Sequence, residues 1–415
     1  MIRIWLACIG LLILQVVDAQ NKAAVDWLNN NLLPIKSLKA GHDMEDLKKL
    51  DGFIGDSRVV ALGECTHGSA EIFSMKHRII EYLVKEKGFT IFSIEANMPE
   101  AYKLNDYILH GKGNAKALLA GMYFWTWQTE EVLELVEWMK KYNEGNSKKI
   151  YFTGFDMQFH PVALQNVKAF YAKHHIAGSE KLARFDSLTS GIRYASGQDN
   201  RKIAEPLMDI ALAMQQDMDA SAQAKQDADY TWIKQNVTVL WQYAASNAHR
   251  QGRDVSMAQN VEWIAAQNPG SKIILWAHNA HIHKKKYWMG KFLQEKMGKD
   301  YLAIGFTSEA GTYTAYNRID KRNKLDSANL LTASSKTDYE YYLKAAATDN
   351  YFLLLNTFTP NDQNAFLFDK KKLRLIGALV VPGKNQFMKT DLINEFDALI
   401  FIRNTSSSRC FAIGN

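Results

Sequence analysis

The chain has 415 residues, of which 47% are hydrophobic and 12% aromatic, so it is long and apolar enough to form a sizeable globular core. Its net charge of +6 is spread over the chain, and the short lysine run at 284–286 is typical of a solvated loop, so we expect no nucleic-acid partner. Of the three cysteines, Cys8 lies near the N-terminus, and Cys65 with Cys410 could form at most one disulfide, which excludes a disulfide scaffold.

The first nineteen residues have the pattern of a secretory signal peptide. Arg3 precedes an apolar run at 4–14, and small residues at Val17 and Ala19 favour cleavage after Ala19. The run is too short to span a bilayer. We therefore expect a secreted or periplasmic protein without a membrane span after cleavage, in which residues 20–415 form a single α/β domain.

Apolar runs along the chain predict a series of strands. Short helices at 25–33 and 44–50 are expected to lead into the first of them. The predicted strands are 59–62, 90–95, 149–156, 272–277, 301–306, 351–355, 375–381 and 398–402. Strand signals vanish from about 161 to 260, which indicates a largely helical insertion. Strands separated by helical stretches predict an α/β fold with a parallel or mixed central sheet flanked by helices. Residues 404–409 form the one low-complexity tract.

A helix is predicted at 71–87, directly after the first strand. Its apolar stripe consists of Ile72, Ile79, Ile80 and Leu83. Lys76 falls inside this stripe, whereas His77 and Arg78 point away from it. Because a buried lysine is costly unless it meets an anion or a site, we expect one of these beside Lys76, with a side chain that reaches solvent as the alternative.

Two further helix starts and an aromatic block have distinct sequence signals. Thr129 is a predicted N-cap, and Asp254 is a predicted N-cap for a helix through Ala266. Most of the aromatic block at 122–127 is expected in the core, with one or two side chains forming a ligand wall.

Polar residues follow the predicted strands at the points where they end. These residues are Glu64 and His67, Glu95, Asp156, and His278 and His281. Since parallel strands gather their carboxyl ends at one edge of a sheet, we expect these side chains around one cleft. Glu64 stands three residues before His67 and can accept its Nδ1–H, which would raise the basicity of the other nitrogen. The pattern predicts a hydrolytic acid–base site or a metal site.

The residues leave the metal alternative open. His278, His281 and His283, with acids nearby, could hold zinc or manganese, but the chain has no His-Glu-x-x-His motif. We expect no required cofactor and keep a divalent metal as the alternative. A serine nucleophile is less favoured, because Ser69 lies in a glycine-flanked turn without the Gly-x-Ser-x-Gly pattern.

These motifs together resemble the erythromycin esterase family. The resemblance rests on residues 63–71, 76–78, 93–96, 154–158, 253–260 and 276–281. It implies an α/β core with a helical insertion and hydrolysis of a macrolactone ester by an activated water. It places the catalytic histidine on His67, its paired acid on Glu64, a second acid on Glu95 and a basic residue on Lys76, where some members have arginine. The late histidines of the family fall on His278 and His281.

The two lines of reasoning predict a secreted hydrolase that acts on a small-molecule ester or lactone, with macrolide inactivation as the family's implied outcome. His67 would take a proton from water, Lys76 and an imidazole would stabilise the oxyanion, and His278 or His281 would protonate the alkoxide. Candidate substrate-binding residues are Met122, Trp125, Trp127, Asp156 and Arg253. A metal-dependent hydrolase or peptidase, and a non-catalytic binding protein for a haem-like or polyketide ligand, are the alternatives.

Overall fold

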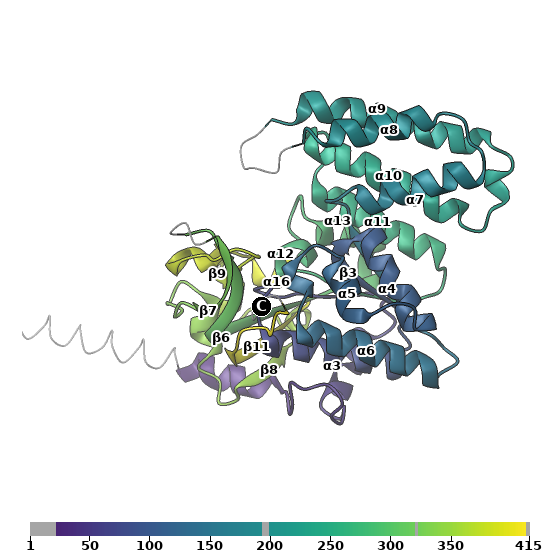
Figure 1. Ribbon diagram of the computed structural model, residues 1–415. Coiled ribbons are helices and arrows are strands. Elements are labelled where there is room, and N and C mark those ends of the chain that lie inside the picture. The colour runs from purple at the N-terminus through teal and green to yellow at the C-terminus, as the bar shows by residue number, and fades with distance from the viewer. Residues whose placement is uncertain (1–21, 193–198, 320–322, 412–415) are drawn as a thin grey trace, which may run out of the picture. The chain divides into compact units, whose positions relative to one another are not determined.

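The computed structural model describes residues 22–192, 199–319 and 323–411 (Figure 1). These residues group into two compact units. Unit 1 contains the described parts of 1–90, 125–138 and 272–415, and unit 2 those of 91–124 and 139–271. The predicted signal peptide lies outside the described residues. Across the described ranges, no helix is both long and apolar enough to cross a membrane.

Unit 1 is built on a mixed sheet, which confirms the predicted fold class. Its strand order is β1-β8-β11-β6-β2-β5, and β7 pairs with β6. The neighbours β11–β6, β6–β2 and β2–β5 are parallel, whereas β1–β8, β8–β11 and β6–β7 are antiparallel. The strands are β1 (Leu33–Pro34), β2 (Val59–Leu62), β5 (Ile273–Trp276), β6 (Tyr301–Asn317), β7 (Lys324–Leu330), β8 (Asn350–Leu353) and β11 (Ala398–Thr405). A separate antiparallel ribbon consists of β9 (Lys372–Arg374) and β10 (Phe387–Lys389).

Strands β2 and β5 are buried along their whole length, as expected for uninterrupted apolar runs in a parallel sheet. The helices of unit 1 are short apart from α3 (Ala70–Lys85). They comprise a helix at 22–31, α2 (Asp51–Ile54), α12 (Asn279–Ile282), α13 (Met289–Met297), α14 (Tyr339–Leu343), α15 (Ala365–Phe368) and α16 (Leu392–Glu395). In place of the helix predicted at 44–50, a 3₁₀ turn at 47–50 leads into α2.

Helix α3 begins where the sequence predicts, with the Oγ of Ser69 accepting the N–H of Ile72 at 3.3 Å. Its apolar stripe and Lys76 are buried. His77 and Arg78 are buried as well, because His77 packs against Trp138 and the segment 37–46 binds Arg78. Arg78 donates to the carbonyl of Ser37 at 2.8 Å and to the carboxylate of Asp46 at 3.0 Å. The helix is therefore enclosed on nearly all sides.

Unit 2 contains the parallel strands β3 (Ile91–Asn97) and β4 (Tyr151–Asp156). Its first helices are α4 (Met98–His110) and α5 (Ala115–Ala120). The helical stretch that follows β4 consists of α7 (Pro161–Lys173), α8 (Ser179–Thr189), α9 (Arg201–Ala220), α10 (Tyr230–Asn247) and α11 (Arg253–Gln267). The Tyr171 hydroxyl donates to the carbonyl of Met214 at 2.9 Å and so ties α7 to α9.

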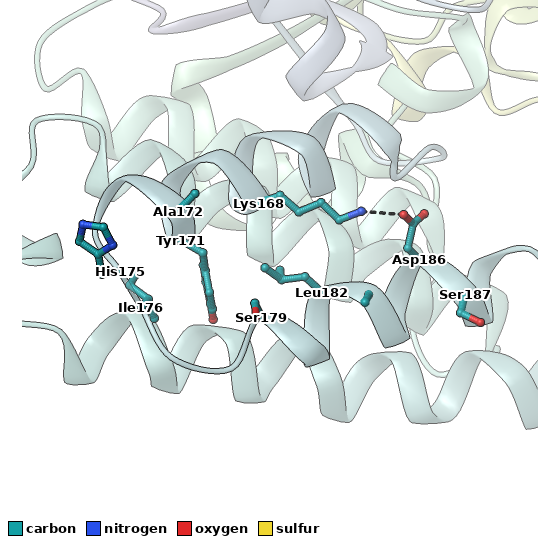
Figure 2. A pocket seen from close by; sticks show the side chains of 10 residues that line it. Lys168, Tyr171, Ala172, His175, Ile176, Ser179, Leu182, Asp186 and Ser187 are labelled. Atoms are coloured by element: carbon teal, nitrogen blue, oxygen red, sulfur yellow. Dashed lines mark hydrogen bonds and ion pairs between the residues drawn. The ribbon is translucent and has the colours of Figure 1, made fainter.

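A pocket of about 740 Å³ lies between α7 and α8 (Figure 2). Apolar side chains, including Ile176 and Leu182, line part of it, and an ion pair of 2.6 Å joins Lys168 to Asp186 at its side. None of the predicted site residues belongs to its lining.

Two predicted element boundaries are wrong. No strand forms at 375–381, because β9 ends at Arg374 and the N–H of Ile376 donates instead to the carbonyl of Cys65 at 2.6 Å. Helix α11 starts at Arg253 with Gly252 as its N-cap, so Asp254 lies in the first turn. The Thr129 prediction is confirmed: its Oγ1 accepts the N–H of Val132 at 3.2 Å, at the start of α6 (Glu130–Gly145).

Candidate active site

The turn between β2 and α3 is held against its neighbours by two glycines. A Cβ at Gly63 would lie 2.1 Å from Oδ1 of Asn279, and a Cβ at Gly68 would lie 1.9 Å from the carbonyl oxygen of Thr314. A side chain at either position would force the turn away from α12 or β6. The close approach fixes His67, which stands between the glycines.

Glu64 and His67 form a buried acid–histidine pair. The Nδ1–H of His67 donates to Oε1 of Glu64 at 2.7 Å. Glu64 is fully buried, whereas His67 retains 8% exposure. Among the described residues, no group forms a hydrogen bond with Nε2 of His67. Because the carboxylate holds the proton on Nδ1, Nε2 is the nitrogen that can accept one.

Two further donors complete the surroundings of Glu64. The ammonium of Lys76 lies 2.5 Å from Oε2, and the indole N–H of Trp276 donates to the same oxygen at 2.7 Å. The ammonium also lies 4.4 Å from the centre of the Trp276 ring, within cation–π range. Lys76 thus meets a carboxylate, as its buried position predicts. Trp276 was not predicted for this role; its place as the last residue of β5, opposite Leu62, was the available signal.

His278 follows β5, and its ring centre lies 5.0 Å from that of His67. Its Nδ1 accepts the N–H of Ala280 at 3.3 Å, and its Nε2–H donates to the carbonyl of Ile376 at 3.0 Å. These contacts select the neutral Nε2–H form of the imidazole. The carbonyl of Ile376 had no sequence signal, since its segment was predicted to be a strand.

The other aromatic and imidazole candidates of unit 1 have different surroundings. Trp127, in the 3₁₀ turn at 125–127, meets the His67 ring edge-on at 6.0 Å, whereas Trp125 is only half-buried. His281, on α12, packs against Trp288 with ring centres 5.6 Å apart. His283 is engaged elsewhere, because its Nδ1 lies 3.1 Å from Oε2 of Glu395.

A second polar cluster lies within unit 2. The guanidinium of Arg253 donates to Glu95 at 2.8 Å and to both oxygens of Asp156 at 3.1 and 2.7 Å. Burial alone would lower the pKa of Arg253, but the two carboxylates raise it above its usual range. Asp156 also accepts the side-chain amide of Gln158 at 2.6 Å. Met122 is fully buried in the same unit.

The structure therefore gathers eight of the predicted site residues in two groups, and His281, Trp125 and Met122 belong to neither. The group in unit 1 contains Glu64, His67, Lys76, Trp127 and His278. The group in unit 2 contains Glu95, Asp156 and Arg253. A single cleft that holds all of them stays a prediction.

The cysteines and the possible metal ligands bear on two alternative mechanisms, thiolate catalysis and metal-dependent hydrolysis. Cys65 and Cys410 are both buried free thiols, and burial raises the pKa of Cys65 to about 12, so it is no thiolate nucleophile at neutral pH. Among the described residues, no group of three or more His, Cys, Asp or Glu side chains is arranged to hold a metal ion. Catalysis without a cofactor stays a prediction.

Comparison with known proteins places this architecture in a family. The family model for erythromycin esterase matches residues 84–405. The chain is 26% identical to the Escherichia coli erythromycin esterase type II, over 92% of this chain and 98% of that protein. A solved structure described as a succinoglycan biosynthesis protein is 28% identical, with a TM-score of 0.76 over 94% of this chain and 98% of that one. A mutant erythromycin esterase in its open conformation shares the fold, with 18% identity and a TM-score of 0.70 over 91% of this chain and 98% of that one. The chain belongs to the erythromycin esterase family.

Proposed function

We propose that this hydrolase of the erythromycin esterase family cleaves a lactone or other ester with a water molecule that His67 activates. The observation that carries the proposal is the arrangement of His67, with Nδ1 held by Glu64 and Nε2 left to accept a proton. A buried carboxylate that stabilises the imidazolium is the electrostatic support that such a base needs.

The proposed reaction is the hydrolysis of an ester by one water molecule. Nε2 of His67 takes a proton from water, and the resulting hydroxide forms a bond to the carbonyl carbon of the ester. The tetrahedral intermediate then breaks its bond to the alkoxy oxygen, and the alkoxide receives a proton from the imidazolium or from His281. The products are a carboxylic acid and an alcohol.

The other residues of the cluster have supporting roles in this proposal. Lys76 is fully buried and donates to Glu64, so we assign it to holding that carboxylate in place rather than to the oxyanion. His278 donates its Nε2–H to the Ile376 carbonyl, so we assign it to shaping the site beside His67.

A macrolactone is the proposed substrate, because the Escherichia coli relative is named an erythromycin esterase. The test is a hydrolysis screen over macrolides, simple lactones and linear esters, read by mass spectrometry for the gain of one water. Ligand binding without any product after prolonged incubation would favour a non-catalytic binding protein.

Replacing His67 by Ala should abolish turnover, because it removes the proposed base, and should lower the thermal unfolding midpoint only modestly, because Glu64 keeps Lys76 and Trp276 as hydrogen-bond donors. The measurement is steady-state kinetics together with a melting curve. His283→Asn is the matched control: it alters a histidine that is bound to Glu395, and activity should persist. A large loss of stability in His67→Ala would point to a structural role instead.

Metal dependence and secretion are tested on the same preparation. We propose that activity survives chelation and that purified protein contains no stoichiometric divalent metal; loss of activity with its return on adding zinc or manganese would favour the metal-dependent hydrolase.

We also propose that the protein is exported, so the mass of the mature chain should correspond to a start at Gln20.

A further inference from the structure

The seven residues 405–411, here called the C-terminal strap, pair with the turn that carries His67. The N–H of Ala70 donates to the carbonyl of Ser406 at 2.9 Å, and the N–H of Ser408 donates to the carbonyl of Gly68 at 2.8 Å. These two bonds make an antiparallel bridge between Ser69 and Ser407. The turn thus gains backbone hydrogen bonds that neither β2 nor α3 supplies.

The same strap then pairs with the start of α6. The N–H of Glu130 donates to the carbonyl of Arg409, and the N–H of Phe411 donates to the carbonyl of Gln128, each at 2.9 Å. A second antiparallel bridge results, between Thr129 and Cys410. This loop directly follows Trp127, whose ring meets that of His67.

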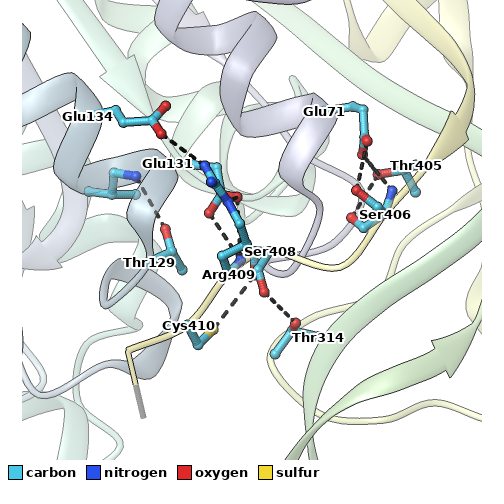
Figure 3. A network of polar contacts seen from close by, with 11 residues as sticks. Glu71, Thr129, Glu131, Glu134, Thr314, Thr405, Ser406, Ser408, Arg409 and Cys410 are labelled. Atoms are coloured by element: carbon cyan, nitrogen blue, oxygen red, sulfur yellow. Dashed lines mark hydrogen bonds and ion pairs between the residues drawn. The ribbon is translucent and has the colours of Figure 1, made fainter. Parts of the chain in front are cut away.

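Side chains fasten the strap at both loops (Figure 3). Near the His67 turn, Glu71 accepts the Ser406 hydroxyl at 2.7 Å, the Ser406 N–H at 2.5 Å and the Thr405 hydroxyl at 2.8 Å. The middle of the strap is held by Thr314, whose hydroxyl donates to the carbonyl of Ser408 at 3.0 Å.

At α6, Arg409 binds two carboxylates (Figure 3). Its Nε lies 3.0 Å from Glu131, which is almost fully buried, and its Nη2 lies 2.9 Å from Glu134. The backbone N–H of Arg409 also donates to Glu131, at 3.2 Å. Charge-assisted bonds of this kind are stronger than neutral ones and fix geometry as well as contact.

We propose that the C-terminal strap positions His67 and Trp127 relative to each other, so that Glu71 and Arg409 are positioning residues for the hydrolysis. This inference rests on the proposed function. Both loops lie outside regular secondary structure, and the strap is a single piece of chain bonded to both. Because a displacement of about 1 Å at a reacting group can cost 10²-fold in rate, loosening either bridge should lower kcat.

The strap can be altered without opening the core. A cavity of about 880 Å³ lies beside it, lined in part by Glu71, Glu131, Ser406 and Arg409. The Arg409 side chain is 60% exposed. Its removal therefore leaves little empty space, and an effect on catalysis can be separated from unfolding.

The experiment compares Arg409→Ala and Glu71→Gln with wild type and with Arg409→Lys. The control is Arg250→Ala, because the Arg250 side chain is about as exposed as that of Arg409 and also pairs with a glutamate, Glu205. We expect Arg409→Ala and Glu71→Gln to lower kcat about tenfold with KM within about twofold. Arg409→Lys should recover much of the loss, and Arg250→Ala should match wild type. The thermal midpoint of each variant is measured in parallel; Arg409→Lys keeps a cation beside the buried Glu131 and so separates a loss of positioning from a loss of stability.

A second readout needs no substrate. Proton NMR should detect a downfield N–H signal from the His67–Glu64 hydrogen bond, assigned by its absence in His67→Asn. In Arg409→Ala and Glu71→Gln this signal should broaden or vanish, and in Arg250→Ala it should persist.

Failure of the strap inference and failure of the proposed function give different results. If the wild type hydrolyses esters while both strap variants keep its kcat and its N–H signal, the strap inference is overturned and the proposed function stands. If the wild type hydrolyses no ester but the signal is lost in the strap variants, the positioning role is supported and the proposed chemistry fails. A kcat loss that follows the thermal midpoint, with the signal intact, would also overturn the inference.

Discussion

At the scale of single residues, Glu64 combines full burial with three hydrogen-bond donors. Its partners are His67, Lys76 and Trp276. Breaking a buried ion pair by removing one partner leaves an uncompensated charge, which typically costs about 3–5 kcal/mol. We expect Glu64→Gln to lower the free energy of unfolding by about that amount, because the Lys76 ammonium stays buried, and to abolish turnover. Urea unfolding and kinetics provide the measurement.

The double variant Glu64→Gln/Lys76→Met is the control for this prediction. It removes both charges and keeps the volume of the lysine stem, so most of the lost stability should return while activity stays absent. Wild-type stability in the single variant would show that the pair is not the buried contact described above.

Glu100, in the first turn of α4, is a second buried carboxyl group, and its pKa is raised. Burial raises its pKa from 4.5 to about 7, although a hydrogen bond from Asn97 opposes this. Among the described residues, its Oε1 is buried without a hydrogen-bond partner. The folded state therefore binds the Glu100 proton more tightly than the unfolded chain, so this residue makes stability fall as the pH rises from about 4.5 to about 7.

We expect Glu100→Gln to remove this slope. Above about pH 7 the variant should be more stable than wild type by roughly 3 kcal/mol, from 1.36 kcal/mol per pKa unit, and near pH 4 the two should be nearly equal. Denaturant unfolding across this pH range is the measurement. A difference that is independent of pH would contradict the assignment.

At the scale of elements, the turn between β2 and α3 depends on the close approach of Gly68 to β6. Gly68→Ala would place a methyl group 1.9 Å from the Thr314 carbonyl oxygen, so the turn must shift or the sheet must open. We expect loss of soluble protein, or folded protein with no turnover. Gly145→Ala, at the end of α6 and with no atom within 4 Å, is the matched control and should be tolerated. Soluble yield and kinetics measure both.

The elements also show what the sequence could predict. Apolar runs located β2, β5 and β6, and the helical period placed Lys76 on a buried face. The sequence could not predict the contact of Trp276 with Glu64, because 212 residues separate them and only the register of β2 with β5 brings them together.

Two other misses have their own physical reasons. The run at 375–381 is apolar because Ile376 packs against Tyr313 and Ala315 of β6, but only an isolated bridge, between Leu379 and Tyr316, joins it to the sheet. Periodicity cannot distinguish such a packed segment from a strand. Most of the C-terminal strap lies in the low-complexity tract at 404–409, and the sequence predicts no role for it, because its partners Glu71 and Glu131 are set by tertiary structure.

At the scale of the whole molecule, the proposed catalytic pair belongs to a unit assembled from three separate stretches of chain. Within it, β2 pairs with β5 and β6, more than 200 residues later, and those pairings fix the turn that bears His67. Unit 2 is interleaved with it in sequence and carries its own cluster of Glu95, Asp156 and Arg253. Such long-range pairing predicts slow folding relative to helical proteins of the same size.

The pairing of β2 with β5 and β6 has a consequence for the timing of biosynthesis. The ribosome adds residues from the N-terminus, so the histidine at position 67 emerges long before either neighbouring strand, and longer still before the strap. Under the proposed function, a growing chain therefore has no hydrolase activity until β5 and β6 have been synthesised. Competence should arise late in translation, and products that end before β6 should be inert, because β2 then lacks a neighbouring strand.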